Sequence, residues 1–154
     1  MVISQLISEC RRIIGESSDT PMLDAKVIVK SALKIDDIGL ILNKDKEVDG
    51  NLAKTAAAMA EKRKNHVPVA YITGHREFMS LDFAVESGVL IPRPDTECVV
   101  EAVIKNVSEG SILDIGTGSG AIAVSLAQYI PESTVTAIDI SDKALETAKH
   151  NALA

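Results

Sequence analysis

Apolar side chains in the first 65 residues recur every three or four positions, which is the spacing of amphipathic helices. Four helices are predicted, and a start or stop signal stands beside each of them. Gly15 ends the first, Thr20-Pro21 opens the second, Asp36 starts the third, and Asp49 or Asn51 caps the fourth, giving helices over 3–14, 21–33, 36–42 and 49–64. Their side chains form no reactive constellation, so the pattern predicts a small helical module.

The spacing changes after Pro68. Short extended segments are predicted at 77–79 and 81–85, on either side of Ser80, and at 89–91. Pro92-Arg93-Pro94 keeps the backbone extended and then opens a helix. The order that follows is strand, glycine-rich turn, helix, strand and helix, at 112–115, 116–120, 121–130, 134–138 and 141–154.

A strand, a glycine turn, a helix and a second strand make half of a mononucleotide-binding α/β unit. Two parallel strands cannot bury both faces of their sheet, and both edges stay unpaired. We therefore expect the chain to be a fragment of a larger α/β protein. Its open sheet edge predicts self-association or domain swapping.

Composition and charge narrow the function classes. No apolar run reaches the roughly 20 residues that cross a bilayer, and the N-terminus lacks signal-peptide features, so we expect a cytoplasmic protein without membrane contact. Cys10 and Cys98 stand alone, which favours neither a metal site nor a disulfide, and Cys98 is predicted in a helix core. Residues 71–154 carry 5 Lys+Arg against 12 Asp+Glu, and this acidic balance argues against direct nucleic-acid binding.

The candidate chemistry is concentrated at 114–127, which read DIGTGSGAIAVSLA. Gly116, Gly118 and Gly120 allow a sharp turn and a close approach of backbone to ligand. The helix behind the turn offers N–H groups to a carboxylate or phosphate. Asp139 ends the second strand, where an acid can accept both ribose hydroxyls. The motif predicts a nucleoside cofactor.

Two cofactors fit this motif. The pattern Gly116-x-Gly118-x-x-Ala121 satisfies a relaxed dinucleotide fingerprint, which predicts NAD and an oxidoreductase fragment. Asp114 before the turn and the third alternate glycine, Gly120, favour S-adenosylmethionine, with Asp114 supplying negative charge near the sulfonium cation. A non-catalytic helical binding module is the remaining alternative.

The segment 68–97, PVAYITGHREFMSLDFAVESGVLIPRPDTE, closely resembles the interdomain stretch of the HemK/PrmC family of release-factor glutamine methyltransferases. The resemblance extends over essentially the whole chain and is strongest over 68–140. It implies a cytoplasmic enzyme that moves the methyl group of S-adenosylmethionine to the amide nitrogen of a glutamine. That glutamine lies in the Gly-Gly-Gln loop of class 1 peptide chain release factors, the implied partners.

The resemblance also implies an α+β arrangement and a set of site residues. A helical substrate-recognition domain spans 1–67, a β-hairpin linker 68–93, and the first half of a Rossmann-like methyltransferase domain 94–154. The cofactor loop corresponds to Gly116, Thr117, Gly118, Ser119 and Gly120, with Asp139 on the ribose and, beside the pocket, Arg93, Thr96 and Glu97.

The family's catalytic Asn-Pro-Pro-Tyr loop is the missing part of this pattern. No asparagine in the sequence is followed by proline. An amide nitrogen is a poor nucleophile, so its methylation depends on positioning and on stabilising the charge that develops. We therefore expect no turnover from the chain alone and no catalytic residue within it. The sequence also predicts no metal site, and it predicts that Lys62-Arg63-Lys64 is a solvated basic helix end.

Overall fold

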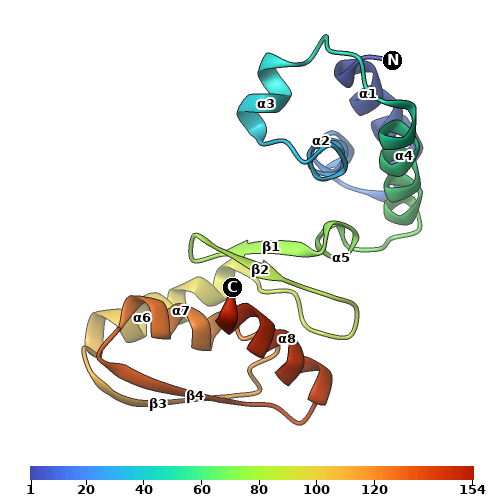
Figure 1. Cartoon of the computed structure of the whole chain (residues 1–154). Helices are drawn as coiled ribbons and strands as arrows, with labels where there is room; N and C mark the ends of the chain where they lie inside the picture. Colours follow the sequence, from blue (N-terminus) through green and yellow to red (C-terminus); the bar gives the residue numbers. More distant parts are fainter. The chain divides into compact units, whose positions relative to one another are not determined.

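A computed structural model describes residues 1–154, which form two compact units, Met1–Thr73 and Gly74–Ala154. The first unit is entirely helical (Figure 1). Its helices are α1 (Ile3–Ile14), α2 (Pro21–Leu33), α3 (Asp37–Leu42), α4 (Gly50–Lys64) and α5 (Val69–Thr73). The first four confirm the predicted helices. The short α5 was not predicted, because its five residues are too few to show a helical period.

The helix starts in this unit follow from side-chain chemistry. The Asp36 carboxylate accepts the Gly39 N–H at 2.7 Å, and the Asp49 carboxylate accepts the Asn51 N–H at 2.8 Å. These are N-cap bonds, which satisfy amide groups that have no partner inside the helix. Thr20 is the N-cap residue of α2, with Pro21 at the first helical position as predicted, but its side chain makes no cap bond and its hydroxyl donates to Asp24 instead.

The core of the helical unit lies where α1, α2 and α4 contact one another. Met22 and Leu52 stand at apolar positions of the helical spacing but are 39% and 40% exposed. Ile28 takes the central position on α2 instead. The buried apolar side chains are Ile3, Leu6, Cys10, Ile14, Ala25, Ile28, Val29, Leu40, Ala56 and Ala60.

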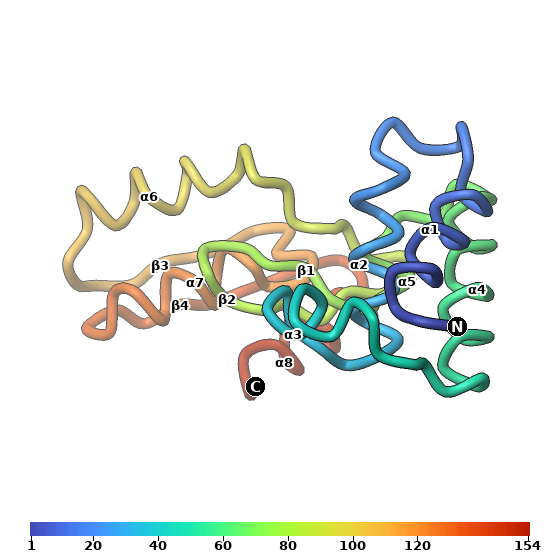
Figure 2. Tube along the Cα trace, turned by 90° about the horizontal axis from the view of Figure 1, so that it is seen from above, coloured from blue at the N-terminus to red at the C-terminus, as the bar shows by residue number.

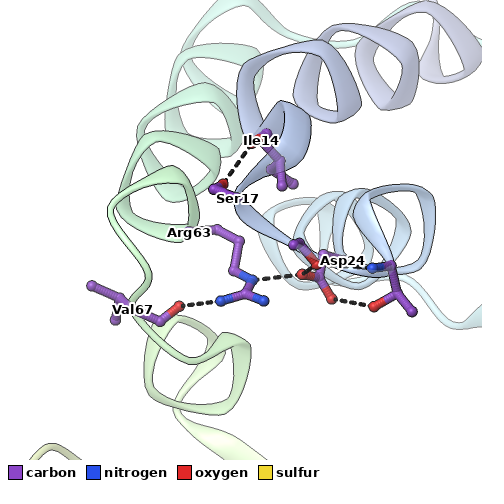
Figure 3. A network of polar contacts seen from close by, with 7 residues as sticks. Ile14, Ser17, Asp24, Arg63 and Val67 are labelled. Atoms are coloured by element: carbon purple, nitrogen blue, oxygen red, sulfur yellow. Dashed lines mark hydrogen bonds and ion pairs between the residues drawn. The ribbon is translucent and has the colours of Figure 1, made fainter.

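An ion pair at the edge of this core joins α4 to α2 (Figure 3). The Arg63 Nε donates to the carboxylate of Asp24, which is only 8% exposed. The Ser18 hydroxyl donates to the same carboxylate at 2.7 Å, and a second guanidinium nitrogen lies 3.5 Å from the Val67 carbonyl. The prediction of a solvated basic end is therefore wrong for Arg63, which is a structural cation.

The second unit contains two small sheets and three long helices. Strands β1 (His75–Phe78) and β2 (Leu81–Ala84) form an antiparallel hairpin, and β3 (Gly110–Ile115) and β4 (Ser133–Ile138) pair in parallel. The helices are α6 (Glu97–Asn106), α7 (Ala121–Tyr129) and α8 (Asp142–Leu153). The predicted extended segment at 89–91 is not a strand, because the Val89 N–H donates to the Glu86 carbonyl and closes a turn.

All three helices lie on the same side of β3 and β4 (Figure 1). Helix α7 contacts both α6 and α8 and lies between them when the unit is seen from above (Figure 2). Phe78 and Phe83 from the hairpin are buried with Val100, Leu126 and Ile130. The opposite face of the sheet is open, with exposed fractions that include Leu113 at 57%, Ile115 at 73% and Ile138 at 45%.

Helix α6 turns Val100, Val103 and Ile104 toward the core of the second unit but leaves Cys98 outside it. Cys98 was predicted in the core, but it is exposed and its thiol donates to the Asp95 carbonyl. Val99 is half exposed, and Val100 is the fully buried residue. Across the whole chain, no helix combines the length and the apolar content that a membrane span needs.

Candidate functional site

The glycine-rich turn between β3 and α7 is anchored on the end of β4. The N–H groups of Gly116 and Thr117 donate to the Ile138 carbonyl at 2.8 and 3.0 Å. The Gly120 N–H closes the turn on the Thr117 carbonyl at 2.9 Å. These bonds fix the backbone of the turn, so it forms a preorganised surface.

The three glycines serve different purposes, although all have left-handed φ values of +78°, +58° and +80°. A Cβ atom at Gly116 or Gly118 would meet nothing within 4 Å. A Cβ atom at Gly120 would lie 3.0 Å from the Cα and Cβ atoms of Ala148 on α8. Gly120 therefore permits close helix packing, whereas Gly116 and Gly118 border open space that a ligand can enter.

Asp139 stands at the end of β4 and faces the turn. One carboxylate oxygen accepts the Gly118 N–H at 2.9 Å, and the other accepts the Ser141 N–H at 3.0 Å. These two backbone donors lower the pKa of Asp139, so the group is ionised at neutral pH. Each oxygen keeps a free lone pair, because a carboxylate offers about four acceptor sites. The carboxylate is thus held in place and can still accept a pair of hydroxyl groups.

A cavity of about 290 Å³ opens beside the turn and Asp139. One wall is the turn itself, residues 116–119, with Ala121 and Ile122 from the first turn of α7; the facing wall is the segment 88–93 with Thr96. Arg93 is the only basic residue of the lining, and Asp139 is the only acidic one. A mostly apolar cleft with a few charged groups is typical of a small-ligand site.

The predicted site residues are only partly brought together at this cavity. Residues 116–119, Asp139, Arg93 and Thr96 line it, and Gly120 lies directly behind. Asp114 is absent from the lining, and its carboxylate accepts the Thr117 hydroxyl at 2.7 Å. That contact shapes the turn from its strand side. No group of three or more His, Cys, Asp or Glu side chains is arranged to hold a metal ion.

Glu97 is also outside the cavity and holds the β1–β2 hairpin. Its carboxylate accepts the Met79 N–H at 2.8 Å, and the Tyr129 hydroxyl donates to the Met79 carbonyl at 2.6 Å. Met79 and Ser80 have left-handed φ values of +50° and +59°, which non-glycine residues rarely adopt. The two side-chain contacts stabilise this strained turn, so Glu97 acts on the fold of the hairpin.

Asn151 is a buried polar residue that sequence reasoning missed. It is 8% exposed and lies on the face of α8 that carries the buried residues Ala144, Thr147 and Ala148. Its carboxamide bonds to the backbone of Ala84 and to the carbonyl of Ser119. The sequence does carry a signal for this role, since an amide stands among small side chains at helical spacing. Such a position is buried, and a buried amide requires hydrogen-bond partners.

The chain is similar to known proteins over both units. Residues 5–74 match the PrmC N-terminal domain, and residues 112–154 match a methyltransferase domain. With the parallel β3–β4 pair and its helices, the second match confirms the predicted class, a helical bundle followed by the first half of a Rossmann-like α/β domain.

Several curated relatives carry the same name, release factor glutamine methyltransferase. The protein of Moorella thermoacetica is 42% identical over 156 residues, which cover 99% of this chain and 55% of the relative. That of Clostridium acetobutylicum is 39% identical over 98% of this chain and 54% of the relative. That of Neisseria gonorrhoeae is 42% identical over 88% and 50%. The chain therefore spans about half the length of the curated relatives it matches.

Proposed function

Because the chain belongs to the HemK/PrmC family of methyltransferases, we propose that it is part of an enzyme that methylates a glutamine side chain. The methyl donor is S-adenosylmethionine. The acceptor is the amide nitrogen of the glutamine in the Gly-Gly-Gln loop of class 1 peptide chain release factors, and the reaction takes place in the cytoplasm. The observation that carries this proposal is the anchored glycine turn facing the Asp139 carboxylate, in a chain similar to release factor glutamine methyltransferases over nearly its whole length.

The residues of the cavity fit the proposed cofactor. The Asp139 carboxylate would accept the two ribose hydroxyls, since both of its oxygens keep acceptor capacity. The open space beside Gly116 and Gly118 lets the ligand approach the backbone. The first turn of α7 offers N–H groups to the carboxylate of the methionine part. When bound, the cofactor supplies an electrophilic methyl group on sulfur.

The remaining requirement of the reaction is the positioning of the acceptor nitrogen. Its lone pair is delocalised into the carbonyl, so the nitrogen must be held in line with the methyl group while charge develops. The family's Asn-Pro-Pro-Tyr sequence does not occur in these 154 residues. We therefore assign cofactor binding to this chain and propose that the chain by itself does not turn over.

A methyl-transfer assay tests the proposal. A purified class 1 release factor is incubated with labelled S-adenosylmethionine, and a release factor with Glu in place of the Gly-Gly-Gln glutamine serves as the matched control. We expect an enzyme of the relatives' full length that contains this chain to label only the natural release factor, and the chain alone to label neither. Label on the control, or on nucleic acid or small molecules instead, would show that the substrate is wrong.

The relaxed dinucleotide fingerprint at Gly116, Gly118 and Ala121 keeps an NAD-dependent oxidoreductase as the second candidate. Calorimetric titration with NADH and with S-adenosylhomocysteine separates the two functions. We expect binding of S-adenosylhomocysteine and none of NADH. Binding of NADH alone would overturn the methyltransferase assignment.

We also propose that this chain self-associates through the open edge of its parallel sheet, beside an apolar face that is also exposed. Leu113, Ile115 and Ile138 are exposed there, and Ile140 beside them is completely exposed. Contiguous apolar surface of this kind favours association. Light scattering should show a mass that rises with protein concentration, and a clean monomer at high concentration would refute this proposal.

A further inference from the structure

Asn151 lies on α8, outside the cavity lining, and joins the glycine turn to the end of strand β2. Its Oδ1 atom accepts the Ala84 N–H at 2.8 Å. Its Nδ2 atom donates to the Ala84 carbonyl at 3.0 Å and to the Ser119 carbonyl at 2.8 Å. The carboxamide thus uses its oxygen and both of its N–H groups in a site that is almost closed to water.

The two partners of Asn151 lie in different segments, and only one of them lines the cavity. Ser119 is part of the glycine turn, lines the cavity and is 2% exposed. Ala84 is the last residue of β2 and stands four positions before Gly88, where the facing wall begins. A single side chain therefore ties the glycine turn to the strand that leads into the segment 88–93.

We propose that Asn151 is a positioning residue of the cofactor site, which sets the separation of the glycine turn from the segment 88–93. The proposal rests on the proposed use of S-adenosylmethionine, because that ligand must contact both walls. A cavity whose walls are fixed in advance binds a small ligand more tightly, since less ordering accompanies binding. The Ser119 carbonyl is the point at which the Asn151 side chain contacts the turn.

Thr147 provides a matched control on the same helix. It lies one turn before Asn151, is 6% exposed, and its hydroxyl donates to the Glu86 carboxylate at 3.1 Å. Thr147 therefore also ties α8 to the segment after β2, but it makes no hydrogen bond to the glycine turn. Replacing it perturbs the packing of α8 to a similar degree and leaves the Ser119 carbonyl paired.

The test compares Asn151→Ala with Thr147→Ala in two measurements, the affinity for S-adenosylhomocysteine and the hydrogen exchange of amides 117–120. Loss of a hydrogen bond that orients a binding wall should weaken the affinity of Asn151→Ala roughly five- to tenfold. Exchange of the turn amides should become faster in the same variant. Thr147→Ala should keep an affinity within about twofold of the natural chain. Equal affinity losses in both variants, or none in Asn151→Ala, would overturn the proposal.

Two further measurements test the proposal if Asn151→Ala does not fold. Asn151→Asp keeps the shape of the side chain and removes its donors, so it should lose affinity as Asn151→Ala does; natural affinity would contradict the proposal. In the natural chain, the side-chain amide signal of Asn151 should shift on saturation with S-adenosylhomocysteine together with that of Gly118. A shift at Gly118 with none at Asn151 would also contradict it. If the natural chain binds no S-adenosylhomocysteine, the proposed function fails, and the exchange measurement still decides whether Asn151 orders the turn.

Discussion

Replacing Gly120 by alanine tests whether the close packing of the turn against α8 requires glycine at this position. The residue has a φ of +80°, and a new Cβ would lie 3.0 Å from the Cα and Cβ of Ala148 and 3.4 Å from its carbonyl oxygen. The left-handed backbone costs a non-glycine residue about 1–2 kcal/mol. Forcing a methyl group against the backbone of α8 adds about 1–3 kcal/mol. We expect the free energy of unfolding of the second unit to fall by about 2–5 kcal/mol.

Gly118→Ala is the matched control for this change. Its φ of +58° brings the same kind of backbone cost, but a Cβ there meets nothing within 4 Å. We expect a loss of only about 1–2 kcal/mol. Gly118 lines the cavity, whereas Gly120 lies behind it. Gly118→Ala should therefore affect ligand binding more than it affects stability. Gly120→Ala should affect stability more than it affects ligand binding.

Hydrogen exchange read by mass spectrometry measures both variants. Peptides from α7 and α8 report on the second unit, and peptides from α1 and α4 serve as an internal standard, because the two units have separate cores. Protection should fall in α7 and α8 and stay unchanged in α1 and α4. If Gly118→Ala lowers protection as much as Gly120→Ala, the close approach to Ala148 is not what requires glycine, and the reasoning is refuted.

Three other predictions follow from the cysteines, the buried ion pair and the acid of the site. Arg63→Met leaves the Asp24 carboxylate buried without its cation, so urea unfolding of the helical unit should show a loss of about 3 kcal/mol; an unchanged midpoint would contradict this. Exposed Cys98 should react with a thiol reagent on mixing, whereas Cys10, whose pKa burial raises to about 11, should react only as the protein unfolds; equal rates would contradict it. Two backbone donors lower the pKa of Asp139, so its charged form stabilises the fold. This stabilisation is present above the ordinary Asp pKa and is lost only as the pH falls through the lower value. Ligand affinity should therefore stay constant from pH 7 down to about pH 4, and an NMR titration of Asp139 with a midpoint at or above the ordinary value would contradict that.

The helical unit could be predicted because its signals are local. The apolar spacing and the carboxylates at Asp36 and Asp49 act within one helical turn, and the structure confirms the helices that they define. The errors arose where tertiary contacts decide. The face of α6 that turns inward is set by packing under the hairpin, so Cys98 could not be placed from spacing alone. Arg63 was assigned to solvent because its partner, Asp24, lies 39 positions away.

In the candidate site, too, local contacts could be predicted and distant ones could not. The glycine turn and Asp139 follow each other along one strand–helix–strand path, so their approach could be predicted. Glu97 reaches a hairpin turn 18 positions earlier, and Asn151 reaches strand β2 across 67 positions. No local pattern encodes such distances. Asp114 is predicted near the cofactor from its position before the turn, and in the structure its carboxylate accepts the Thr117 hydroxyl and does not line the cavity.

The central claim is that Asp139 holds the ribose of an S-adenosyl nucleoside beside the glycine turn. Titration calorimetry with S-adenosylhomocysteine tests it most directly, on the natural chain, on Asp139→Asn and on Asp142→Asn, an exposed acid three positions away that does not line the cavity. We predict that Asp139→Asn lowers the affinity at least about tenfold, as expected for a hydrogen bond to a charged group, and that Asp142→Asn leaves it unchanged. Equal affinities in all three proteins, or no binding by the natural chain, would contradict the account.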